Sequence, residues 1–82
     1  MTASNSDIRE WLRQAQEQKA THLIMVCDTY DWEDYPVYVQ EGQDPREEAA
    51  KYGTNSLRVM EVYSLSKDLE SQIAEHRAFH FD

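Results

Sequence analysis

The sequence predicts a small α+β domain, because helical and extended apolar patterns alternate along the chain. Apolar residues recur at helical spacing near the start, and the run "LIMVC" is apolar at both strand parities. The segment "DPREEAAKYG" carries the start and stop signals of a short helix. With 82 residues the chain is long enough for one hydrophobic core and too short for two, so we expect a single domain spanning residues 1–82.

The first predicted element is an amphipathic helix that begins near Ser6. Four apolar residues form one stripe at the spacing i, i+3, i+4 and i+7, namely Ile8, Trp11, Leu12 and Ala15. Ser4 or Ser6 is the candidate N-cap, and the helix should end near Lys19 or Ala20.

Two strands should follow this helix. "THLIMVCD" is apolar on both faces, which predicts a central strand with neighbours on both edges. "YPVYVQ" alternates, and its proline favours an edge position. Cys27 is the one cysteine of the chain, and its apolar surroundings predict a buried, reduced thiol.

A second helix is predicted at "DPREEAAKYG". Asp44 is the expected N-cap, Pro45 the first helical residue, Glu47 the partner in a capping box, and Gly53 the residue that ends the helix.

The last two elements are a strand and a helix. "LRVMEVYSL" predicts a strand, although some of its spacings also suit a helix, with four residues on one parity: Leu57, Val59, Tyr63 and Leu65. The final helix should begin near Ser66 and be anchored by Leu69 and Ile73. In the closing tail, Phe79 and Phe81 either seal the sheet or present a docking edge to a second copy.

The predicted topology is therefore α-β-β-α-β-α with a three-stranded antiparallel sheet. A short loop allows the first two strands to form a hairpin, and the second helix can return the chain across the sheet. Placing the doubly apolar strand in the centre gives the spatial strand order 2-1-3. We expect the helices mainly on one face of this sheet.

The net charge limits the partners. A formal charge of −8 repels phosphate backbones, so we expect no direct nucleic-acid binding and favour a protein partner with a basic surface, which an acidic chain can attract as a nucleic-acid mimic does. Acidity that serves only solubility is the alternative. No signal peptide or membrane-spanning run is seen, so we expect a cytoplasmic protein without membrane contact.

The loop between the first two strands has the most distinctive composition. "CDTYDWEDYP", residues 27–36, holds four carboxylates and three large rings without a basic residue. Such carboxylates repel one another within a screening length of about 8 to 10 Å, and a partner presenting Arg or Lys would relieve that repulsion. We interpret the loop as a candidate protein-binding site formed by Asp28, Tyr30, Asp31, Trp32, Glu33, Asp34 and Tyr35. In the alternative interpretation the rings fold back over the sheet and the acids face water.

Catalytic motifs are not found in the sequence. "CDTYD" has the outline of a metal-dependent hydrolase that uses Asp28 and Asp31, but the spacing Asp-x-x-Asp and the rest of the chain do not complete that motif. The EF-hand pattern is absent, and His76 and His80 lack an obvious third zinc ligand. We therefore expect no catalytic residue, no metal and no cofactor.

Two stretches carry a resemblance to a known group of proteins. "THLIMVCDTYDWEDYPVYV" and "LRVMEVYSLSKDLESQIAEHRAFHFD" resemble short, functionally uncharacterised proteins of bacteriophages and prophage regions, and the similarity extends from "DIREWL" to "HRAF". The resemblance implies neither a reaction nor catalytic residues. It implies an accessory role in which the protein binds host or phage proteins.

The prediction for function is a noncatalytic protein-binding module of a phage or prophage. The alternatives are the small metal-dependent hydrolase and a self-associating structural protein. A homodimer is possible.

Overall fold

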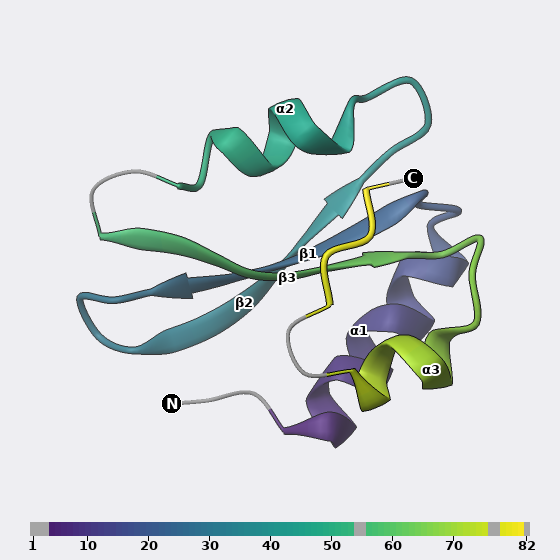
Figure 1. The fold of residues 1–82 in the computed structure, drawn as a ribbon, viewed down its shortest axis with the longest axis horizontal. Helices are drawn as coiled ribbons and strands as arrows, with labels where there is room; N and C mark the ends of the chain where they lie inside the picture. The colour runs from purple at the N-terminus through teal and green to yellow at the C-terminus, as the bar shows by residue number, and fades with distance from the viewer. Residues whose placement is uncertain (1–3, 54–55, 76–77, 82) are drawn as a thin grey trace.

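The computed structural model describes residues 4–53, 56–75 and 78–81, and it arranges them in the order α-β-β-α-β-α (Figure 1). The elements of these described residues are α1 Asn5–Glu17, β1 His22–Asp28, β2 Glu33–Val39, α2 Pro45–Ala50, β3 Leu57–Ser64 and α3 Leu69–Ala74. The strands form one antiparallel sheet in the order β2-β1-β3. The predicted α+β class, the element order and the central position of β1 are confirmed.

Each face of the sheet has its own core. Figure 1 shows α1 and α3 on one side of the strands and α2 on the other, so two of the helices share a face as expected and α2 covers the opposite one. The α1/α3 core contains the buried residues Ile8, Leu12, Leu23, Met25, Tyr63 and Ala78. The α2 core contains the buried residues Ile24, Val26, Val39, Ala49 and Val62.

Strand β1 is apolar on both faces because it contributes to both cores. Leu23 and Met25 point into the α1/α3 core, while Ile24 and Val26 point into the α2 core. The thiol of Cys27 is buried, as predicted. A strand covered on both sides leaves no room for the polar alternation of a half-exposed strand.

A β-bulge at Met60 corrects the predicted side-chain parity of β3. Met25 pairs with Glu61 whereas the next residue of β1, Val26, pairs with Val59, so one residue of β3 has no partner in β1. The prediction that Leu57, Val59 and Tyr63 share a face is therefore wrong. Leu57 and Val59 pack against the α2 core, and Tyr63 belongs to the α1/α3 core together with Met60 and Leu65.

Helix α1 has a specific cap at each end. The Ser4 hydroxyl accepts the Asp7 N–H at 3.2 Å and the Asp7 carboxylate accepts the Ser4 N–H at 3.1 Å, which is a capping box. At the other end the Lys19 N–H donates to Gln16 and the Ala20 N–H donates to Ala15, the two bonds of a Schellman motif. Lys19 has φ 60 and cannot continue a right-handed helix, so α1 ends at Glu17 and not near Lys19 or Ala20.

Helix α2 begins as predicted and ends earlier. Asp44 is the N-cap and Pro45 the first helical residue, but the Asp44 carboxylate accepts the Arg46 N–H at 2.9 Å, and no reciprocal bond from Glu47 is present among the described residues. The C-cap is Lys51, so Gly53 lies two residues beyond it.

Helix α3 begins later than predicted. Its N-cap is Asp68 and its first residue is Leu69, not a residue near Ser66. The expected anchors Leu69 and Ile73 pack against the α1/α3 core. Within the described part of the chain, no helix has the length and apolar composition required to cross a bilayer.

Candidate functional site

The connection between β1 and β2 is a hairpin loop of four residues, 29–32, closed by the pairing of Asp28 with Glu33. The Asp28 carboxylate accepts the Tyr30 N–H at 2.9 Å. The N–H and the hydroxyl of Thr29 both donate to the Ser56 carbonyl, at 2.6 and 2.7 Å, next to the start of β3. The base of the loop is therefore held in place while its side chains remain available. We call residues 28–34 the hairpin tip.

Two large rings of the hairpin tip lie in solvent. Tyr30 is 88% exposed and Trp32 is 62% exposed. Among the described residues, Phe79 is the other large apolar side chain that is exposed, at 44%. A protein with so small a core normally uses its aromatic rings for packing, so two neighbouring exposed rings mark a candidate contact surface.

The backbone of Trp32 is in the left-handed region, with φ 57. This conformation favours glycine and costs other residues about 1–2 kcal/mol. A bulky indole at such a position lowers the stability of the turn without adding packing to the core. Strained residues of this kind gather at functional sites, which draws attention to Trp32 on grounds separate from its exposure.

The four carboxylates of the hairpin tip differ in exposure. Asp31 and Glu33 are exposed, and Asp28 and Asp34 are half-buried.

Burial raises the pKa of the Cys27 thiol, and a hydrogen bond with the Asp34 carboxylate raises it further. Cys27 is thus a protonated, packed side chain at neutral pH and contributes no nucleophile.

Tyr35, the remaining residue of the predicted site, points elsewhere. It pairs with Val26 and its ring packs against the α2 core, where burial raises the pKa of the phenol. The predicted set therefore divides into four side chains that face solvent, Tyr30, Asp31, Trp32 and Glu33, and three that are half-buried, Asp28, Asp34 and Tyr35. Tyr35 lies on the same face of β2 as Val37 and Val39, which also pack in the α2 core.

Metal-binding geometry is not found among the described residues. No group of three or more His, Cys, Asp or Glu side chains is placed to hold a metal ion there. His76 of the predicted histidine pair lies outside the described residues, and His80 contacts the Glu75 carboxylate at 2.6 Å. One carboxylate oxygen of Asp28 is already engaged by the Tyr30 N–H.

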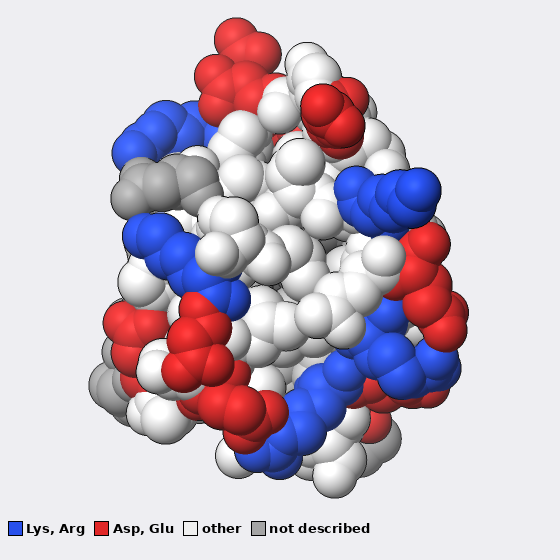
Figure 2. Space-filling view, turned by 90° about the vertical axis from the view of Figure 1, so that its right-hand side faces the viewer, with Lys and Arg blue, Asp and Glu red and all other residues white. Residues whose placement is uncertain are grey.

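The opposite end of the molecule has a different surface. Figure 2 shows an uncharged centre surrounded by side chains of both charges, at the end where the α1–β1, β2–α2 and β3–α3 connections lie in Figure 1. A shallow hollow at this end is lined by Ala20, Thr21, His22, Leu65 and Ser66. A second shallow groove lies between α1 and α3, where Arg9 forms a bidentate ion pair with Glu70. Neither has the concentration of one charge seen at the hairpin tip.

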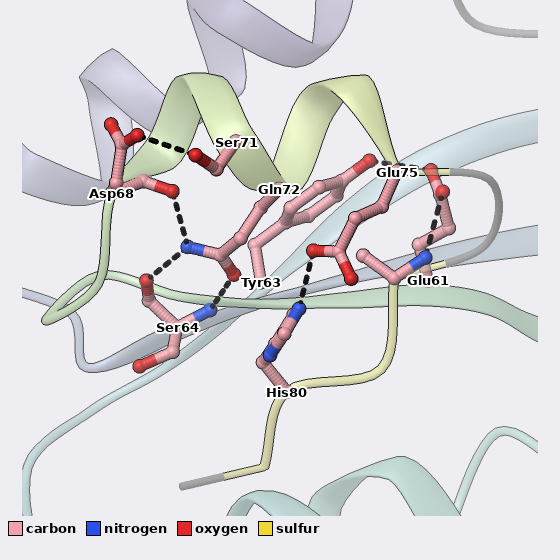
Figure 3. A network of polar contacts seen from close by, with 9 residues as sticks. Glu61, Tyr63, Ser64, Asp68, Ser71, Gln72, Glu75 and His80 are labelled. Carbon is pink, nitrogen blue, oxygen red and sulfur yellow. Dashed lines mark hydrogen bonds and ion pairs between the residues drawn. The ribbon is translucent and has the colours of Figure 1, made fainter.

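A polar network that was not predicted from the sequence lies at the outer side of β3 and is drawn in Figure 3. The buried Gln72 amide accepts the Ser64 N–H at 2.7 Å and donates to the Ser64 carbonyl at 2.8 Å. Tyr63 donates its hydroxyl hydrogen to the Glu61 carboxylate, which also accepts the Ala78 N–H at 3.2 Å. A glutamine at an apolar helix position, one residue before Ile73, is the signal that could have indicated this network.

Comparison with known proteins identifies no relative. No family model matches the chain, and neither a curated protein nor a solved structure matches it. The geometry of the hairpin tip therefore carries the functional proposal.

Proposed function

We propose that this protein is a noncatalytic protein-binding module whose hairpin tip contacts a partner with a basic surface. The observation that carries the proposal is the exposure of Tyr30 and Trp32 beside acidic side chains. Buried aromatic anchors supply most of the affinity in many protein interfaces, and tryptophan and tyrosine are enriched among them.

The negative charge of the hairpin tip favours a partner surface with positive charge. The tip contains four carboxylates and no Lys or Arg, whereas the rest of the chain carries all eight basic residues. Exposed Asp31 and Glu33 flank the Trp32 indole, so a basic surface would meet negative charge and apolar contact area together. Such an arrangement raises the association rate and makes it sensitive to salt.

The strain at Trp32 supports the same proposal. An indole held at positive φ weakens the turn, and its retention there is understandable if its contact area serves a partner. The resemblance to phage and prophage proteins leads us to include an accessory role toward a host or phage protein in the proposal.

Capture from a host lysate tests the proposal. Immobilised wild-type protein should retain a partner that Trp32→Ala loses by at least about tenfold, because truncation of a buried aromatic anchor costs about 2 kcal/mol or more. The retained fraction is measured by quantitative mass spectrometry, with circular dichroism to verify that the variant remains folded.

A charge-matched pair of variants separates the hairpin tip from the net charge. Asp31→Asn with Glu33→Gln removes two exposed charges at the tip, and Glu41→Gln with Glu47→Gln removes two exposed charges elsewhere. The first double variant should reduce capture and the second should not. Equal capture by wild type and Trp32→Ala, or equal losses for the two double variants, would contradict binding through the tip.

A further inference from the structure

The outer side of β3 is hydrogen-bonded to segments that are not strands of the sheet. The Val62 N–H donates to the Ala78 carbonyl at 2.9 Å, and the Val62 carbonyl accepts the His80 N–H at 2.9 Å. Two residues further on, the Gln72 side chain occupies the N–H and the carbonyl of Ser64 (Figure 3). The outward backbone groups at both positions are therefore satisfied without another strand.

Residues 78–81, which we call the C-terminal strap, pack along this edge and reach both cores. Ala78 is 1% exposed within the α1/α3 core, and Phe81 packs against the α2 core. The Arg46 guanidinium lies over the Phe81 ring, 4.7 Å from its centroid. In Figure 1 the yellow strap runs from the α3 side across β3 toward the α2 side. Its bridge to Val62 is parallel and one residue long.

Side chains at the bulge strengthen the contact. Glu61 accepts the Ala78 N–H with one carboxylate oxygen and the Tyr63 hydroxyl with the other. The His80 ring contacts the Glu75 carboxylate beyond the end of α3. The strap is thus attached through its backbone, the apolar side chains of Ala78 and Phe81, and the His80 imidazole.

The edge formed by β2 is protected in a different way. Pro36 lacks an N–H and interrupts any ladder that another strand could build there. Glu33 and Asp34 also place two negative charges on β2, so two copies would repel at this edge. β3 contains one acid and one base, Glu61 and Arg58, and two copies in antiparallel orientation carry complementary charges.

We propose that the C-terminal strap keeps the protein monomeric by occupying the β3 edge at Val62, and that its displacement opens this part of the edge, as far as the position held by Gln72, to β3 of a second copy. The contact would be isologous, with two β3 strands antiparallel about a two-fold axis. An uncovered strand edge with apolar neighbours is a template for such pairing. This inference does not depend on the hairpin tip.

Removal of residues 78–82 tests the proposal. The full chain should sediment as a monomer, and the truncated chain should form a dimer whose fraction rises with concentration. A peptide of sequence "AFHFD" added in excess should restore the monomer. In the truncated protein, the Val62 N–H should exchange with solvent at least about tenfold faster at dilutions where the dimer dissociates. A folded truncated chain that stays monomeric at all concentrations would overturn the proposal.

A pair of full-length variants guards against misfolding of the truncated chain. His80→Pro removes the N–H that bonds to Val62 together with the imidazole, whereas His80→Ala removes the imidazole alone. The proline variant should show a larger dimer fraction than the alanine variant, which keeps the backbone bond to Val62 and loses only the contact with Glu75. Equal monomer content in both folded variants would also overturn the proposal, and a dimer without renewed protection of Val62 would assign the contact to another surface.

Discussion

The hairpin tip and the outer edge of β3 use polar and aromatic side chains in opposite ways. At the tip, two rings lie in solvent and the carboxylates concentrate one charge. At the β3 edge, the backbone groups of Val62 and Ser64 have partners, and the Gln72 side chain that bonds to Ser64 is 2% exposed. The difference indicates that the edge serves stability, while the tip is available for contact with another molecule.

The two regions also differ in how much they contribute to the stability of the fold. Satisfied buried hydrogen bonds contribute modestly when formed, but a lost partner leaves an unsatisfied group that costs about 1–3 kcal/mol. An exposed ring that contacts nothing contributes little to folding. Substitutions at the edge should therefore lower stability, and substitutions at the tip should change binding with little effect on stability.

The largest stability effect should come from Gln72→Leu. This change removes the Gln72 oxygen that accepts the Ser64 N–H and leaves the Lys67 N–H as the remaining backbone donor to the Ser64 carbonyl, so we expect the free energy of unfolding to fall by about 2 kcal/mol in urea denaturation. Ser71→Ala on the same helix removes an exposed hydroxyl that bonds to Asp68, and it should change stability by less than about 0.5 kcal/mol. A loss below about 1 kcal/mol for Gln72→Leu would remove the distinction between the two regions.

Alkaline pH should weaken the edge as well. Burial and the bond to Glu61 raise the pKa of Tyr63, so the folded protein keeps a proton that the unfolded chain releases above its ordinary pKa of about 10. The stabilisation is complete below that pH and is lost as pH rises toward the folded pKa. In urea titrations above about pH 10, the free energy of unfolding should fall by about 1.4 kcal/mol per pH unit for this group.

Tyr63→Phe provides the control for this pH dependence. The variant should show a shallower alkaline decline than the wild type, while the contribution of Cys27, whose pKa is also raised by burial, should remain. An unchanged slope would mean that Tyr63 does not hold its proton in the folded state.

The smallest effects on stability should come from substitutions of the two non-glycine residues with positive φ. Lys19→Gly and Trp32→Gly both relieve a left-handed backbone, and each should change the free energy of unfolding by no more than about 1 kcal/mol, in the stabilising direction. Trp32→Gly should nevertheless lose partner capture, whereas Lys19→Gly should retain it. Marked destabilisation by Trp32→Gly would show that the indole supports the fold.

Local signals predicted much of the architecture. The helical stripe from Ile8 to Ala15 and the doubly apolar run in β1 identified the buried faces, because burial selects apolar side chains at the period of each element. Asp44 and Pro45 identified the start of α2, since caps satisfy backbone groups within a few residues. For the candidate site, the composition of residues 27–36 identified the loop but did not separate the outward rings from Tyr35.

The sequence by itself determined the elements, their order and the acidity of the hairpin tip, because these follow from neighbours along the chain. Only the tertiary structure decided the bulge at Met60, the bonds of Gln72 to Ser64 and the pairing of the C-terminal strap with Val62. Those contacts join residues 8 to 18 positions apart, or depend on how β3 fits against β1. These contacts form only when the sheet forms, so no hydrophobic period or helix cap in the sequence predicts them.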